Sequence, residues 1–131
     1  MRKLITSFIL FFSFFLSSQE PLFTLIDSSK TGINFSNDLI DTKEHSIFLY
    51  ANYYGGAGVG IGDFDNDGLE DIFLAANLID DKIYKNLGNF KFEDKTKMSG
   101  IINNGSWSTG VTVADVNNDG LLDIYISCEL Y

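Results

Sequence analysis

Two nine-residue segments, 52 positions apart, share the pattern Asp-x-Asp/Asn-x-Asp-Gly-x-x-Asp and occupy residues 63–71 and 115–123. Each follows a stretch in which small and β-branched residues alternate, at 58–62 and at 110–114, and each runs into an apolar stretch. Alternation with a period of two is typical of a β-strand. The sequence therefore predicts two acidic turns, each with a strand on either side.

The acidic turns have the composition of a cage for a hard cation. Side-chain oxygens stand at alternate positions, and Gly68 or Gly120 stands where the backbone must bend, which glycine does at least cost. Ca²⁺ takes about six to eight oxygen ligands in irregular geometry, which fits this pattern. We therefore predict two Ca²⁺ sites. The ligands of the first are Asp63, Asp65, Asp67, the carbonyl of Leu69 and Asp71, and those of the second are Asp115, Asn117, Asp119, the carbonyl of Leu121 and Asp123.

Asn117 contributes a neutral amide oxygen where the first loop has Asp65. Because affinity for Ca²⁺ follows the charge of its ligands, we expect the second site to bind more weakly.

Other interpretations of the loops fit less well. Mg²⁺ prefers octahedral geometry and keeps its waters. Zn²⁺ sites need Cys and His ligands, and the chain has one of each. An EF-hand needs a glutamate at loop position twelve, where this chain has Leu74 and Ile126. A metal-free acidic turn would leave the four carboxylates predicted as ligands in the first loop repelling one another.

The repeat extends beyond the acidic turns. A looser similarity joins residues 23–33 to residues 92–101, and the sequence Asn86-Leu87-Gly88-Asn89 between two short β-type stretches predicts a hairpin turn. One unit thus reads strand, cation loop, strand, polar connection, strand, turn, strand. Four short antiparallel strands in about 50 residues is the period of a propeller blade. We expect Val59, Ile61, Val111 and Val113 to face one packing layer, with the intervening small residues allowing a close backbone approach.

Residues 58–90 resemble an FG-GAP/VCBS-type repeat through the glycine-bearing strand, the acidic loop and the run Lys82-Ile83-Tyr84-Lys85-Asn86-Leu87-Gly88-Asn89-Phe90. Residues 107–125 resemble the next repeat. The resemblance implies an all-β fold of four-stranded antiparallel blades in a calcium-binding propeller of the integrin-α-head type, similar to secreted bacterial VCBS-repeat proteins and the cartilage acidic protein family. It places calcium on the ten positions given above. Such propellers usually have about seven blades. This chain would supply about one and a half to two, so we expect an N-terminal fragment whose remaining blades lie in a longer parent chain.

The N-terminus has the features of a secretory signal peptide. Arg2 and Lys3 precede an apolar stretch at residues 4–16 that is too short to span a membrane, and the small residues Ser17 and Ser18 follow. We therefore divide the chain into a signal peptide (1–18), a lead-in strand and loop segment (19–54), a first repeat (55–103) and a truncated second repeat (104–131). No membrane span is expected after signal cleavage, and the location is expected to be secreted, periplasmic or cell-surface.

The net charge, and the residues outside the acidic loops that could carry another function, limit the classes of ligand that this chain can bind. The net charge is −9, and removal of Arg2 and Lys3 leaves seven basic residues against 18 acidic ones, which argues against nucleic acid. The glycine-rich stretch before the first loop lacks a P-loop lysine. His45 is expected in a solvated loop, and Cys128 in a buried apolar position. Tyr50, Tyr53, Tyr54 and Trp107 are expected to pack between blades, with a sugar-stacking platform as the alternative.

The sequence thus predicts a non-enzymatic, calcium-binding propeller protein that recognises an extracellular protein or polysaccharide. Two alternatives stay open: the propeller part of a secreted enzyme whose catalytic domain lies downstream, or a structural spacer.

Overall fold

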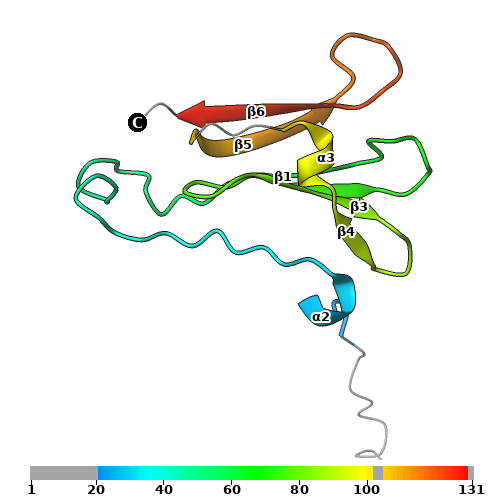
Figure 1. Ribbon diagram of the computed structural model, residues 1–131, viewed down its shortest axis with the longest axis horizontal. Coiled ribbons are helices and arrows are strands. Elements are labelled where there is room, and N and C mark those ends of the chain that lie inside the picture. The colour runs from blue at the N-terminus through cyan, green and yellow to red at the C-terminus, as the bar shows by residue number, and fades with distance from the viewer. Residues whose placement is uncertain (1–20, 102–104, 130–131) are drawn as a thin grey trace, which may run out of the picture.

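The computed structural model describes residues 21–101 and 105–129, and the predicted signal peptide lies outside this part of the chain. The described residues form two antiparallel sheets, of four and two strands, with two helical turns and no closed barrel (Figure 1). The all-β expectation agrees with this architecture. The strands are β1 (Val59–Gly62), β2 (Asp71–Leu74), β3 (Lys82–Asn86), β4 (Phe92–Asp94), β5 (Trp107–Ala114) and β6 (Asp123–Glu129).

The first sheet is a meander with the order β1-β2-β3-β4, so each strand pairs with the next in the chain. The predicted strand, loop and hairpin order of the first repeat is thus found. β4 begins at Phe92 and not at Phe90, because Asn89 and Phe90 have φ angles of 53° and 57°. This left-handed conformation cannot continue a strand.

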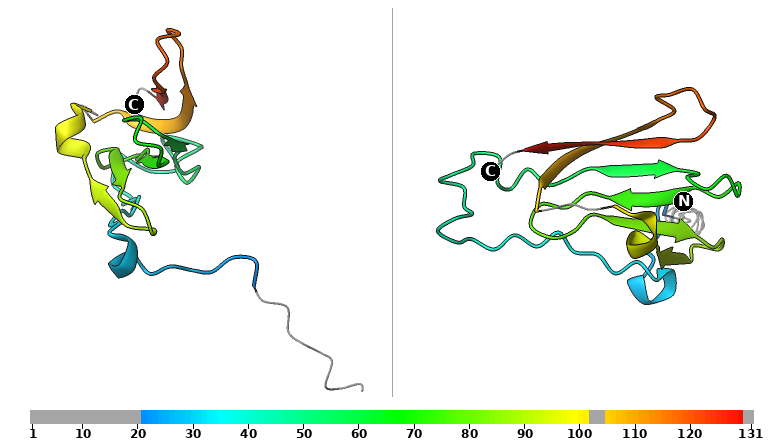
Figure 2. Two further views of the ribbon diagram at one scale, coloured as in Figure 1. Left: turned by 90° about the vertical axis from the view of Figure 1, so that its right-hand side faces the viewer. Right: turned by 45° about the horizontal axis from the view of Figure 1, so that its top comes forward.

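The second sheet pairs β5 with β6 from Trp107↔Glu129 to Ala114↔Asp123. Strand β5 lies against β1, and the two views in Figure 2 show the second sheet stacked beside the first. The contact is made possible by glycine: a β-carbon added to Gly60 would lie 2.8 Å from a methyl carbon of Val111 and 2.9 Å from one of Val113. A β-carbon added to Gly58 would lie 2.5 Å from the backbone nitrogen of Val111, so the predicted close approach of another backbone is present between the two repeats.

The predicted single layer of branched side chains is wrong. Val59 and Ile61 are each 57% exposed, whereas Gly60 and Gly62 are the buried residues of β1. Since successive side chains of a strand point to opposite faces, the glycines face Val111 and the branched residues face away. The small residues of β1, and not its large ones, mark the face that packs against the second repeat.

Aromatic side chains fill the core. Tyr53, Phe73, Tyr84 and Trp107 are between 0% and 3% exposed, and the rings of Tyr53 and Trp107 lie 5.3 Å apart. The Tyr84 hydroxyl donates to the carbonyl of Asn34 at 2.8 Å, which fixes the lead-in segment against β3. Core packing of Tyr53 and Trp107 is thus confirmed.

The predicted packing does not extend to Tyr54, which is 63% exposed. Its hydroxyl donates to the Asp41 carboxylate, at 3.0 Å to the nearer oxygen, and this bond raises the pKa of Tyr54.

Asn77 joins three segments that are distant in the sequence. Its backbone N–H donates to the side-chain oxygen of Asn37 at 3.0 Å, and its own side-chain oxygen accepts from Asn37 at 2.6 Å. Its side-chain nitrogen donates to the carbonyl of Ser108 at 2.9 Å and to that of Gly56 at 3.3 Å. A buried amide is stable only when its polar atoms are hydrogen-bonded. The Asn77 side chain therefore fixes the positions of the lead-in segment, the first sheet and β5 relative to one another.

Asp81 makes a second buried connection. Its carboxylate accepts from the backbone N–H of Ala76 at 2.7 Å and from the hydroxyl of Ser108 at 3.0 Å. Burial raises the pKa of Asp81, although both hydrogen bonds act in the opposite direction. The N–H of Ser108 also donates to the carbonyl of Ala76 at 3.1 Å, so the start of β5 is tied to the β2–β3 connection by three polar contacts, through Asn77, Asp81 and Ala76.

The lead-in segment contains no strand among its described residues, contrary to expectation. Phe23 and Leu25 are 86% and 98% exposed, so this stretch has no sheet to pair with in the described chain. The predicted similarity to residues 92–101 appears in the helical turns instead. The turns α2 (Ser28–Thr31) and α3 (Thr96–Ser99) each end at a glycine with φ of 79° or 74°.

Two further single-residue expectations need correction. Cys128 is exposed and not buried: it lies near the end of β6 in the two-stranded sheet, with its sulfur 3.8 Å from the Ser108 hydroxyl. His45 does lie in a loop, but it is half-buried rather than fully solvated.

None of the helices in the described ranges has the length and apolarity that crossing a bilayer would require.

Candidate metal centre

The first acidic loop connects β1 to β2, which pair antiparallel down to Gly62↔Asp71. Both oxygens of the Asp63 carboxylate accept hydrogen bonds from the turn, from the N–H of Asp67 at 3.0 Å and that of Gly68 at 2.8 Å. Asn66 and Gly68 have φ angles of 57° and 86°. Asparagine and glycine tolerate this left-handed conformation best, so the sequence favours a chain curled around Asp63.

Asp71 closes the loop and is 3% exposed. One carboxylate oxygen accepts from the N–H of Asn86 at 2.7 Å, and the other accepts from the N–H of Phe64 at 3.3 Å. The Asn86 side chain donates in turn to the carbonyl of Glu70 at 2.8 Å. Strand β3 thereby fixes the carboxylate at the base of the loop.

Three of the four predicted carboxylates of the first loop come together. One oxygen from each of Asp63, Asp65 and Asp71 lies within 4.8 Å of the others. Asp67 is turned away from this group: one of its oxygens accepts from the N–H of Leu69 at 2.9 Å, and the other faces Lys85. The loop offers oxygen ligands alone, which suits a hard cation such as Ca²⁺.

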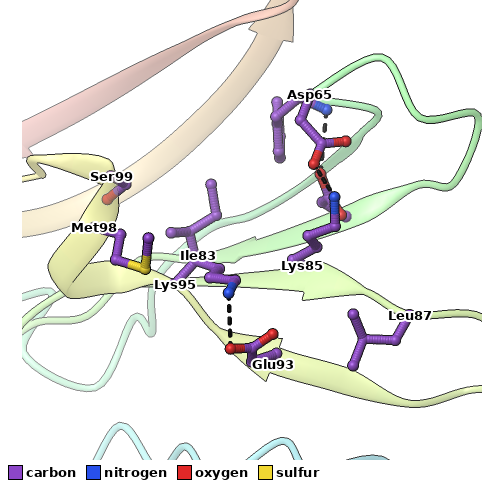
Figure 3. Close-up of a pocket in the computed structure, with 10 residues that line it drawn as sticks. Asp65, Ile83, Lys85, Leu87, Glu93, Lys95, Met98 and Ser99 are labelled. Atoms are coloured by element: carbon purple, nitrogen blue, oxygen red, sulfur yellow. Dashed lines mark hydrogen bonds and ion pairs between the residues drawn. The ribbon is translucent and has the colours of Figure 1, made fainter.

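Lys85 of β3 reaches into the first loop (Figure 3). Its ammonium group forms an ion pair with the carboxylate of Asp67 at 2.9 Å and a second, closer one with that of Asp65. The hydrogen bond from Lys85 holds the pKa of Asp67 below its usual value, helped by the backbone N–H of Leu69. The same pairs, that with Asp65 first, raise the pKa of Lys85. The loop therefore already contains one cation, supplied by the protein.

The second loop repeats the geometry of the first. The Asp115 carboxylate accepts from the N–H groups of Asp119 and Gly120, at 3.1 and 2.9 Å. Asp119 accepts from the N–H of Leu121 at 2.8 Å, and Asp123 accepts from that of Val116 at 3.0 Å. Each of these bonds has its counterpart 52 residues earlier. The two loops, which share one sequence pattern, thus also share one hydrogen-bond pattern.

The surroundings of the second loop differ. Asn117 donates from its amide nitrogen to Asp119 at 3.0 Å, on the oxygen equivalent to the one that faces Lys85 in the first loop. Asp123 is half-buried, whereas Asp71 is buried. Within the described residues, no three acidic side chains of the second loop converge as Asp63, Asp65 and Asp71 do. The ligand types still suit Ca²⁺, with one carboxylate fewer.

A hollow of about 550 Å³ lies on the sheet face beside the first loop. Figure 3 shows Lys85 and Glu93 on its floor, from β3 and β4, with the ion pair between Lys95 and Glu93 at 2.7 Å. Ile83, Leu87 and Met98 supply its apolar part. The hollow therefore adjoins the loop through Asp65 and Lys85, which line both.

Sequence reasoning missed two residues that contact the first loop from outside it, Lys85 and Asn86. Both come from β3, which enters the site only because β3 pairs with β2 at Ile72↔Tyr84. The alternation in Lys82-Ile83-Tyr84-Lys85 predicted a strand, and a proposed β2–β3 register would have placed Lys85 beside the loop. Nothing local in the sequence gives that register.

A family model, the FG-GAP-like repeat, matches residues 63–126. The match thus begins at the first residue of the first loop and contains the second loop entirely. No solved structure matches the chain.

Cartilage acidic protein 1 of the frog Xenopus tropicalis is 31% identical to this chain over 101 residues. The alignment covers 76% of this chain and 16% of that protein, so the chain spans about a sixth of this curated relative. Together, the family match and this relative support an FG-GAP repeat protein.

Proposed function

We propose that both acidic loops bind Ca²⁺ and that the ions have a structural role. The observation that carries this proposal is the convergence of Asp63, Asp65 and Asp71 within 4.8 Å in a loop built only from oxygen ligands. Carboxylates held this close repel one another unless a cation lies among them. An ion that binds the folded chain but not the unfolded chain stabilises the fold by mass action.

The backbone of each loop supports the same proposal. Asp63 and Asp115 are held by two N–H groups each, so their carboxylates are positioned before any ion arrives. Preorganised ligands lose less conformational freedom on binding. Ca²⁺ would be held by the ten predicted positions, with the carbonyls of Leu69 and Leu121 completing each set.

Isothermal titration calorimetry of the metal-free protein tests this proposal. We expect two Ca²⁺ sites in the wild type and one site in each of Asp63→Asn and Asp115→Asn. Mg²⁺ at the same concentration should bind more weakly, because it resists losing its waters. A folded wild-type protein that gives no calcium heat would contradict the proposal.

We further propose that the repeats are blades of an extracellular β-propeller that recognises a protein or a polysaccharide. The four-stranded meander of the first sheet has the strand order of a propeller blade, and the second sheet packs beside it. The name of the relative, cartilage acidic protein 1, supports an extracellular location. A signal peptide at residues 1–18 is part of the same proposal.

Two measurements address the architecture and the location. Negative-stain electron microscopy of the longer parent chain, which would contain the remaining blades, should show a disc with a central channel, and an elongated stack of sheets would contradict a propeller. Fractionation of the producing cells with N-terminal sequencing should recover a mature chain outside the cytoplasm that begins after residue 18. An uncleaved chain in the cytoplasm would contradict secretion.

A further inference from the structure

Lys85 occupies a position that no part of the proposed calcium role explains. It lies on β3, outside the acidic loop, yet its ammonium group contacts two predicted ligands, Asp65 and Asp67. Its side chain is 29% exposed, and its ion pairs close the side of the loop that faces the hollow. An ammonium group has three donors and no lone pair, so it can never be a ligand of a metal ion.

The charges of the two predicted ligand sets become equal once Lys85 is included. In the first loop the four ligand carboxylates and Lys85 together carry a net charge of −3, with Glu70, which is not a predicted ligand, left out of the sum. The second has three ligand carboxylates and the neutral Asn117, also −3, and no basic side chain pairs with it among the residues that the structure describes. The extra carboxylate of the first loop is thus matched by a lysine, which removes the charge difference that predicted a weaker second site.

We propose that Lys85 is a tethered counter-cation that sets the calcium affinity of the first loop. Without metal it neutralises Asp65 and Asp67, and it leaves them when Ca²⁺ takes their oxygens. This inference rests on the proposed calcium binding and adds to it the residue with which the ion competes.

The neighbouring strand offers Lys85 a second partner. Glu93 of β4 stands directly opposite Lys85 in the register of the first sheet, and both side chains line the hollow. The long flexible stem of a lysine lets its charge move without backbone change. Lys85 can therefore exchange the loop carboxylates for Glu93, which keeps its charge paired in the metal-bound protein.

The strand also provides a matched control. Lys82 lies on β3 with a side-chain exposure of 31% and forms an ion pair with Asp94 at 2.8 Å, away from the loop. Lys85→Met and Lys82→Met each remove one positive charge and one ion-paired lysine from the same strand. Only the first removes a competitor of the ion.

The experiment is calcium titration calorimetry at low ionic strength, in an Asp115→Asn background that leaves the first loop as the only site. We expect Lys85→Met to lower the Kd of the first site by about 3- to 10-fold, the scale of a partly exposed ion pair or two. Lys82→Met should leave that Kd unchanged. Lys85→Arg keeps the positive charge, so its Kd should stay as high as that of the Asp115→Asn protein with Lys85 intact. If the Asp115→Asn protein binds no Ca²⁺ but gains binding when Lys85→Met is added, the inference is supported in its strongest form.

The failing outcomes separate the two proposals. If the Asp115→Asn protein binds Ca²⁺ and Lys85→Met binds it equally or more weakly, Lys85 is not a competitor and only this inference falls. If neither the wild type nor Lys85→Met binds Ca²⁺ while both are folded by circular dichroism, the calcium proposal itself falls. The melting temperature in EDTA gives an independent measurement: Lys85→Met should lower it, since the unpaired carboxylates then repel one another.

Discussion

The two acidic loops have almost the same backbone and very different surroundings. Asn66 and Asn118 have φ angles of 57° and 60°, and Gly68 and Gly120 have φ angles of 86° and 87°. Yet the closing carboxylate of the first loop is buried and accepts from a backbone N–H of β3, while that of the second is half-buried and accepts from the N–H of Val116 in its own loop. The comparison teaches that nine local residues encode the shape of the loop, whereas the neighbouring strands determine its charge balance and burial.

The largest difference between the repeats in the stability lost on substitution is expected at the equivalent glycines Gly58 and Gly110. A β-carbon on Gly58 would lie 2.5 Å from the backbone nitrogen of Val111, whereas one on Gly110 would meet only the hydroxyl oxygen of Ser127, at 2.7 Å. A side chain can rotate away and a paired strand cannot. We expect Gly58→Ala to lower the free energy of unfolding by about 3 kcal/mol and Gly110→Ala by about 1 kcal/mol. Urea unfolding measures both, and equal losses would mean that the repeats do not approach as closely as described.

The second largest difference in stability loss is expected between substitutions of the closing carboxylates, Asp71 and Asp123. Asp71→Ala leaves the N–H groups of Asn86 and Phe64 without their acceptor at a buried position, whereas Asp123→Ala affects only that of Val116. We expect losses of about 2 and about 1 kcal/mol in EDTA, the cost of unsatisfied buried donors. Urea unfolding in EDTA tests this ranking, and a larger loss for Asp123→Ala would reverse our account of which loop depends on its sheet.

The ion pair between Lys82 and Asp94 lies outside the acidic loops, and it shows how much stability a partly exposed ion pair of this protein is expected to contribute. Burial alone would raise the pKa of Asp94, but hydrogen bonds from Lys82 and Thr96 lower it to about 2. Because the folded-state pKa lies below the usual 3.8, this stabilisation is present above about pH 4 and is lost as the pH falls towards 2. We expect Lys82→Met to cost about 0.5 kcal/mol at pH 7, since both partners are partly exposed, and almost nothing at pH 2. A cost that persists in acid would mean that Lys82 acts through packing of its stem.

The smallest effects are expected at the left-handed asparagines. Asn66→Gly and Asn118→Gly remove the strain of a positive φ and raise the freedom of the unfolded chain, so each should change the free energy of unfolding by less than about 0.5 kcal/mol. The two changes should agree, because the φ angles agree within 3°. Thermal melts of the two variants in EDTA check this, and unequal shifts would show that the shared loop geometry breaks down in solution.

Local features of this fold were predictable, and long-range ones were not. The acidic turns and the Gly88 turn depend on residue types with distinct backbone preferences, which a single sequence displays, whereas the helical turns that end at Gly32 and Gly100 were not predicted. By contrast, Val59 and Ile61 were assigned to the wrong face. Alternation identifies a strand but does not say which of its two faces meets another sheet.

The missed partners of the site follow the same rule. Lys85 and Asn86 reach the first loop only through the pairing of β3 with β2, and Asn37 meets Asn77 across 40 residues. Such contacts are set by strand register and by packing, which one sequence without a partner strand does not specify. The lead-in segment was expected to contain a strand, since residues 23–33 resemble residues 92–101, yet a strand exists only where another strand pairs with it.

The glycine face of β1, which packs against the second repeat, restricts the substitutions that this protein can accept in evolution. Gly60 leaves no space for even one methyl group before the side chains of Val111 and Val113. Any lineage that gains volume at position 60 must therefore lose it at position 111 or 113, in a neighbouring repeat about 50 residues away. Repeats that look like independent copies in the sequence are thus obliged to diverge as a matched pair, and a repeat moved into another chain would have to bring its neighbour with it.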